Sequence, residues 1–123
     1  MQWMKQNGIR GYWNDMNEPA VAGSYIPENV IFHTEGRKAS AVEMKNLYGM
    51  LMARSSYEAA RVNEPDKRPF ILTRSGAAGV QRYAALWSGD NFADDDGLLR
   101  SILLNNQLSI SGVAFTGYDV GGY

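Results

Sequence analysis

Cysteine is absent from the 123 residues, which excludes disulfides, zinc-thiolate sites and a cysteine nucleophile. No apolar run approaches the ~20 residues that a membrane-spanning helix needs, so no membrane contact is predicted. Acidic and basic side chains nearly balance, at a net charge of −1, and no cluster of Lys or Arg marks a surface for phosphate backbones. A nucleic-acid partner is therefore not expected.

Histidine is almost absent as well, because His33 is the only one. It falls in "NVIFHTEG", which we interpret as a loop, and no Ser/His/Asp triad is assembled around it. The acidic string "DNFADDDG" lacks the ligand alternation and the distant glutamate of a calcium loop, and capping of a following helix explains it better. Neither a metal nor an organic cofactor is predicted.

The composition is otherwise that of a folded protein, with 45% apolar and 20% charged residues, near the averages for globular domains. The length fits one structural unit. Short strand-like runs alternate with helical patterns, which is typical of βα units around a parallel sheet. Strands are predicted within "IRGYWN", "RPFILT", "RYAALWSG" and "SGVAFTGYD".

Two helices are predicted between these strands. The first runs from Ser40 to about Val62, where apolar residues recur at three- and four-residue steps, and "SAVE" at 40–43 has the spacing of a capping box. The second covers "GLLRSILLNNQLS", residues 97–109, and the acids at 94–96 suit its N-terminus. Its expected apolar face comprises Leu98, Leu99, Ile102 and Leu103.

A charged residue follows each predicted strand: Asp15, Arg74, Asp90 and Asp119. In a parallel sheet the carboxyl ends of the strands lie on one side, and in a (β/α)8 barrel that side carries the active site. At any single position, a loop meeting water is the plainer explanation. The four together favour a site in which three carboxylates and one guanidinium converge.

Convergent acids in an aromatic setting indicate sugar chemistry. Cleavage of a glycosidic bond passes through an oxocarbenium-like cation, which one carboxylate stabilises or attacks while another protonates the leaving oxygen. The aromatics Trp13, Trp87, Tyr118 and Tyr123 flank the same strand ends. Packing in the core or at its rim explains these aromatic residues equally well, so the interpretation as a sugar site depends on the acids.

The longer motifs carry a family resemblance. "WNDMNEP" and "TRSGAAGVQRYAALWSGDN" resemble the two signature stretches of glycoside hydrolase family 31, and "FTGYDVGGY" resembles the segment that follows them. The resemblance covers nearly the whole chain, in the right order. It implies retaining hydrolysis of α-glucosides on a TIM barrel, since "DMNE" is similar to the glucosidase type rather than the α-xylosidase type. The family also includes transglycosylases and lyases, and these activities remain alternatives.

The resemblance also implies roles for the candidate residues. Asp15 matches the family's nucleophile and Asp90 its general acid/base. For Glu18 we weigh a hydrogen bond within the site against capping of a turn, and favour a supporting structural role. The other expected substrate-binding residues are Arg74, Asp119 and, as walls for the sugar, Trp13 and Trp87.

A complete (β/α)8 barrel typically needs about 250 residues, so the resemblance implies a partial barrel. Residues 1–123 are expected to be a fragment of a single catalytic domain, contributing about the fourth to the seventh strand. The expected partners are an α-linked glucoside or oligosaccharide and either the remainder of the barrel or further copies of the chain. A noncatalytic carbohydrate-binding module and an inactive barrel fragment are the alternatives.

Overall fold

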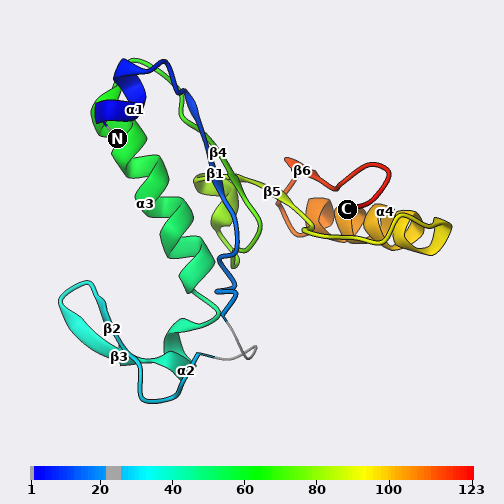
Figure 1. Ribbon diagram of the computed structural model, residues 1–123, viewed down its shortest axis with the longest axis horizontal. Helices are drawn as coiled ribbons and strands as arrows, with labels where there is room; N and C mark the ends of the chain where they lie inside the picture. Colours follow the sequence, from blue (N-terminus) through cyan, green and yellow to red (C-terminus); the bar gives the residue numbers. More distant parts are fainter. Residues whose placement is uncertain (1, 22–25) are drawn as a thin grey trace.

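A four-stranded parallel sheet organises the chain (Figure 1). The computed structural model describes residues 2–21 and 26–123. In chain order the elements are α1 (Gln2–Gln6), β1 (Gly11–Asn14), β2 (Ile31–Thr34), β3 (Arg37–Ser40), α2 (Ala41–Met44), α3 (Tyr48–Asn63), β4 (Phe70–Thr73), the 3-10 helix η1 (Val80–Arg82), β5 (Ala85–Trp87), α4 (Asp95–Ile110) and β6 (Thr116–Gly117).

The strands of this sheet follow the order β1-β4-β5-β6, and every neighbouring pair is parallel. Trp13 pairs with Leu72, Leu72 with Ala85, and Trp87 with Gly117. This confirms the predicted α/β class with parallel strands. All four predicted strands are present, and each is shorter than the run that predicted it.

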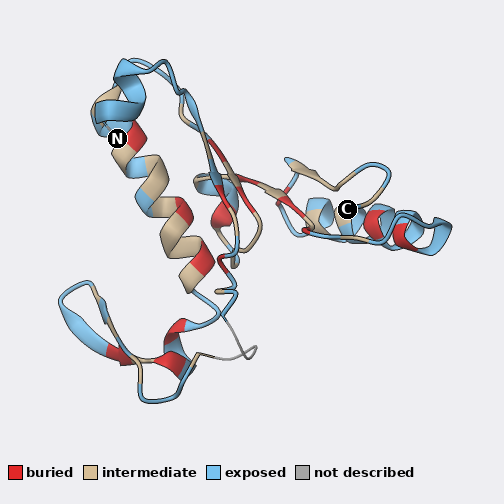
Figure 2. Cartoon of the chain, in the orientation of Figure 1, coloured by how far each residue is buried: buried red, intermediate tan, exposed pale blue. Residues whose placement is uncertain are grey.

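The two faces of the sheet have different surroundings. Helix α3 packs on β1 and β4, and on that face Ile71 and Thr73 are buried. Figure 2 shows buried residues along the sheet and α3, whereas much of the periphery is exposed. On the opposite face Trp13, Phe70 and Phe115 remain 48–67% exposed. That apolar face has no cover within the described part of the chain, and the expectation that the isolated chain self-associates stays a prediction.

The first predicted helix is divided in two, so the prediction of one continuous helix over residues 40–62 is wrong. Its start is confirmed, because Ser40 and Glu43 form both halves of a capping box. Helix α2 ends at Met44, and the amide of Leu47 turns back to donate to the carbonyl of Met44 at 2.9 Å. Asn46 and Gly49, both weak helix formers, lie at the break and in the first turn of α3.

The second predicted helix is confirmed as α4. Its N-cap is Asp94, whose carboxylate accepts a hydrogen bond from the amide of Gly97 at 2.6 Å. The buried positions are Gly97 and Ser101, and the helix as a whole contacts β6. The predicted apolar residues, Leu98, Leu99, Ile102 and Leu103, are 41–55% exposed, so their face is available to other parts of a barrel.

The sequence analysis missed α1, the 3-10 helix η1 and the antiparallel hairpin of β2 and β3. His33 lies on β2 and not in a loop, which corrects the interpretation of "NVIFHTEG". The hairpin turns at Glu35 and Gly36, both with positive φ, as a type I′ two-residue turn requires. The Glu-Gly pair between two short alternating runs was the available signal. None of the described helices has the length and hydrophobicity that a membrane span requires.

Replacing Gly49 by alanine is expected to destabilise the fold by about 1–3 kcal/mol, since overpacking a close contact forces the backbone to move. A Cβ at this position would lie 2.8 Å from the carbonyl group and Cβ of Ser75. Thermal unfolding measures the effect, with Gly117→Ala as the matched control, because a Cβ there meets nothing within 4 Å. An unchanged Tm for Gly49→Ala contradicts this packing.

Candidate active site

The carboxyl ends of the parallel strands bring three of the predicted residues together. Asp15 follows β1 directly, Arg74 follows β4 directly, and Asp90 lies three residues beyond β5. Backbone pairing continues past the strands, because the amide of Arg74 donates to the carbonyl of Asn14 at 3.0 Å. Convergence at this edge of the sheet is therefore a consequence of the parallel register.

Arg74 is the centre of the cluster. Its Nη1 lies 3.2 Å from Oδ1 of Asp15 and 3.5 Å from Oδ1 of Asp90. The side chain of Arg74 is only 14% exposed, whereas those of Asp15 and Asp90 are 34% and 55% exposed. The cation thus lies beneath two acids that remain open to a substrate.

Glu18 is the strongest partner of Arg74. Its two carboxylate oxygens accept from Nε at 2.7 Å and from Nη2 at 3.1 Å, a bidentate pairing that fixes the plane of the guanidinium. The hydrogen bond from Arg74 lowers the pKa of Glu18, and the same bond is the main reason that the pKa of Arg74 is raised. Glu18 therefore orients the guanidinium of Arg74, and the supporting role favoured from the sequence stays a prediction.

The loop after β1 contributes residues that sequence reasoning did not single out. Met16 has a φ of 57°, an uncommon conformation for a side chain of this size. Its amide donates to Oδ1 of Asp15 at 2.8 Å, and its sulfur lies 3.0 Å from Nη2 of Arg74. Asn17 is completely buried. The side-chain amides of the two asparagines in "WNDMNEP" were the only sequence signal for this loop.

Two predicted aromatic walls meet beside the cluster. The rings of Trp13 and Trp87 lie 5.6 Å apart between centroids, at 56°. Trp13 is 67% exposed, whereas Trp87 is 7% exposed. Both line a groove of about 320 Å³ that Asp119 and Tyr118 also border. Of the two rings, Trp13 therefore presents the exposed face and Trp87 is buried.

Asp119 belongs to this groove and not to the arginine cluster. Among the residues that the structure describes, its carboxylate forms no ion pair with Arg74. The main-chain carbonyl of Asp119 accepts from Nδ2 of Asn91 at 3.2 Å, which ties the loop after β6 to the loop after β5. Asp119, the fourth charged residue predicted at a strand end, therefore lies apart from the cluster around Arg74.

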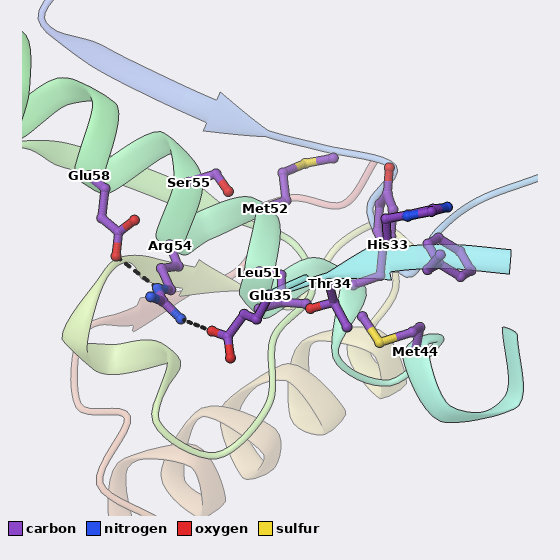
Figure 3. Close-up of a pocket in the computed structure, with 11 residues that line it drawn as sticks. His33, Thr34, Glu35, Met44, Leu51, Met52, Arg54, Ser55 and Glu58 are labelled. Atoms are coloured by element: carbon purple, nitrogen blue, oxygen red, sulfur yellow. Dashed lines mark hydrogen bonds and ion pairs between the residues drawn. The ribbon is translucent and has the colours of Figure 1, made fainter. Parts of the chain in front are cut away.

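A second hollow of about 490 Å³ lies between the hairpin and α3 (Figure 3). Arg54 crosses it, with ion pairs to Glu35 at 3.0 Å and to Glu58 at 2.8 Å. The pair with Glu35 ties the hairpin tip to α3, whereas Glu58 lies on the same helix as Arg54. His33 lines it, but none of the predicted site residues does. Within residues 2–21 and 26–123, no group of three or more acids and histidines is arranged to hold a metal ion.

Replacing Glu18 by glutamine is expected to reduce stability near neutral pH by up to about 1 kcal/mol, the size of a partly exposed ion pair. Because folding lowers the pKa of Glu18 from 4.5, its contribution is complete above about that pH and is lost as pH falls through the lower folded value. Tm measured from pH 3 to pH 7 should therefore converge for the two proteins in acid. Glu28→Gln, at an exposed loop position, is the control, and a constant difference at every pH contradicts the assignment.

Comparison with known proteins gives a consistent result. The model of the glycosyl hydrolases family 31 TIM-barrel domain matches residues 1–123. Alpha-glucosidase 2 of Bacillus thermoamyloliquefaciens is 42% identical over 99% of this chain and 16% of its own length. The alpha-glucosidase of Saccharolobus solfataricus is 33% identical over 99% of this chain and 20% of its own length. The chain therefore spans a fifth or less of these relatives.

Solved structures agree with the fold. A glucosidase II alpha subunit superposes with a TM-score of 0.80 at 39% identity, over 90% of this chain and 12% of the other. The family 31 dextranase of Flavobacterium johnsoniae, complexed with glucose, gives a TM-score of 0.84 at 29% identity, over 99% of this chain and 16% of the other. The parallel sheet described above is part of a TIM barrel.

Proposed function

The chain belongs to glycoside hydrolase family 31, and we propose that it carries the catalytic pair of a retaining α-glucosidase. Asp15 is the nucleophile and Asp90 the general acid/base. Arg74, Glu18, Asp119, Trp13 and Trp87 shape the substrate pocket. Residues 1–123 are one part of a single catalytic barrel, whose other strands cover the apolar face at Phe70 and Phe115 and complete the pocket beside Trp13.

The observation that carries the proposal is the shared contact of two acids with one nitrogen. Oδ1 of Asp15 lies 3.2 Å, and Oδ1 of Asp90 3.5 Å, from Nη1 of Arg74. These oxygens can be no farther apart than the sum of the two distances. Carboxyl groups lie ~5–5.5 Å apart in retaining glycosidases and ~6.5–9.5 Å apart in inverting ones. The two acids are close enough for the retaining spacing, and the choice of the retaining class follows the family resemblance.

In the proposed first step, a carboxylate oxygen of Asp15 attacks the anomeric carbon of the α-glucoside. The bond to the leaving oxygen breaks as Asp90 donates its proton to that oxygen. The product is a β-glucosyl ester of Asp15. In the second step Asp90 takes a proton from water, the water oxygen displaces Asp15, and glucose leaves with its α configuration.

The remaining residues supply orientation. Arg74 contacts both Asp15 and Asp90 and so fixes their positions relative to each other. Glu18 fixes the plane of the Arg74 guanidinium. The exposed face of Trp13 offers an apolar surface to the C–H groups of a pyranose ring. The carboxylate of Asp119, on the same groove, accepts hydrogen bonds from sugar hydroxyls.

The test is the stereochemistry of the first product. Full-length protein is mixed with an aryl α-glucoside in an NMR tube, and the anomeric proton of the released glucose is followed before mutarotation. The proposal predicts α-glucose first. Initial β-glucose contradicts the retaining mechanism, and binding of the glucoside without turnover identifies a carbohydrate-binding module instead.

A further inference from the structure

Asn17 stands out at the mouth of the candidate site because it is buried where its neighbours are not. It is 0% exposed, whereas Met16 is 57% exposed and the side chain of Glu18 is 46% exposed. Burial of a carboxamide is unfavourable unless its donors and acceptor are paired. The contacts of Asn17 therefore indicate what holds this loop.

The carboxamide grips the chain on both sides of Arg74. Its Nδ2 donates to Oγ1 of Thr73 at 2.9 Å, and its Oδ1 accepts from the amide of Ser75 at 3.0 Å. Oγ1 of Thr73 in turn donates to the carbonyl of Ser75 at 2.8 Å. The main-chain N–H of Ser75 can only donate, so the Asn17 atom that faces it is the side-chain carbonyl oxygen. The side-chain NH2 of Asn17 therefore faces Oγ1 of Thr73, and the Thr73 hydroxyl donates its own proton to the Ser75 carbonyl. We call Asn17, Thr73 and Ser75 the clamp.

The clamp interlocks with the arginine contacts. Met16 and Glu18, on either side of Asn17, both contact Arg74. Thr73 and Ser75, on either side of Arg74, both bind Asn17. Each residue of the segment 16–18, which follows Asp15, therefore contacts the segment 73–75 at the end of β4.

We propose that Asn17 is a positioning residue that holds Asp15 and Glu18 in register with Arg74. This inference rests on the proposed function for its catalytic consequence, because the distance from the nucleophile to the acid/base is then set through the clamp. Asn17 is completely buried, and its hydrogen-bond partners are Thr73 and Ser75, not Asp15 or Asp90. Its carboxamide is matched to one donor and one acceptor, so neither aspartate nor leucine reproduces it.

Thr73 permits the most discriminating substitution. Thr73→Val keeps the shape of a completely buried side chain but removes the hydroxyl, whereas Thr73→Ser keeps the hydroxyl. In full-length protein, well below its Tm, Thr73→Val and Asn17→Leu are expected to lower kcat about tenfold to a hundredfold, the effect of a small displacement of reacting groups. KM should change little, and Thr73→Ser should retain most of the activity.

Ser101→Ala is the control for loss of a buried hydroxyl. Ser101 is 4% exposed and donates to the carbonyl of Gly97 at 2.8 Å, away from the clamp. It should lower Tm without changing kcat. If Thr73→Val behaves in the same way, with lower Tm and full kcat, Asn17 has only a structural role and the inference is overturned.

Hydrogen exchange provides a readout that does not depend on activity. Thr73→Val should accelerate amide exchange in residues 15–18, and Asn17→Leu should accelerate exchange of the Ser75 amide, since each loses its partner across the clamp. Unchanged exchange in both variants overturns the inference. A wild-type protein without glucoside turnover contradicts the proposed function, and the exchange result still decides whether the clamp positions the acids.

Discussion

Asp15→Ala is expected to lower kcat/KM for aryl α-glucosides by about four orders of magnitude or more, the usual cost of removing a nucleophile. The reason is geometric as well as chemical. Asp15 is the acid attached directly to the end of β1, and its oxygen lies 3.2 Å from the largely buried Arg74. Steady-state kinetics measure the effect, and Asp66→Ala, at an exposed turn, is the matched control.

Azide distinguishes a missing nucleophile from a damaged fold. In Asp15→Ala the vacated space lets azide attack the anomeric carbon from the side opposite the leaving group, so an activated substrate should give β-glucosyl azide. The identity of this product, read by NMR, assigns the role of the residue. Unchanged turnover in Asp15→Ala, or rescue with α-glucosyl azide, contradicts the assignment.

Asp90→Ala is the second large effect, and it should depend on the leaving group. General acid catalysis contributes about 10²–10⁴-fold, and it matters most when the departing oxygen is basic. We expect a large loss of kcat/KM for maltose and a small one for a dinitrophenyl α-glucoside, whose leaving group needs no proton. The measurement is kcat/KM across aryl glucosides of graded leaving-group acidity.

The same variant should accumulate the glucosyl ester on Asp15, because the base for the second step is missing. Azide then attacks that intermediate and yields α-glucosyl azide, the opposite anomer from the Asp15 variant. Asp90→Asn keeps nearly the same volume and serves as a control for packing. Equal losses for every leaving group contradict a proton-donating role for Asp90.

The sequence predicted the parts of the fold that depend on local patterns. Strands ended by a charge and the Ser40 capping box follow short-range rules, and the structure contains them. The break between α2 and α3 lies at Asn46, a weak helix former, just before Gly49, which packs against the backbone of Ser75. Periodicity alone could not reveal it. The β2–β3 hairpin was missed because its strands carry few apolar side chains.

The candidate site shows the same division. Strand order places Asp15, Arg74 and Asp90 together at one edge of the sheet, whereas Asp119, the fourth charged residue of that prediction, lies on the neighbouring groove. Glu18 pairs with Arg74, 56 positions away in the chain, and the buried Asn17 binds the amide of Ser75, 58 positions away. Such contacts depend on which strands become neighbours, and no local pattern specifies them. The roles of all these residues in catalysis stay predictions.

Covalent trapping tests the central claim most directly. Full-length protein is incubated with a fluorinated α-glucosyl fluoride, in which the second fluorine slows hydrolysis of the glucosyl ester, and is then analysed by intact mass and peptide mapping. We predict one added fluoroglucosyl group, located on Asp15. An adduct on Asp90 or Glu18, or no adduct on folded protein that hydrolyses α-glucosides, would contradict the assignment of Asp15 as the nucleophile.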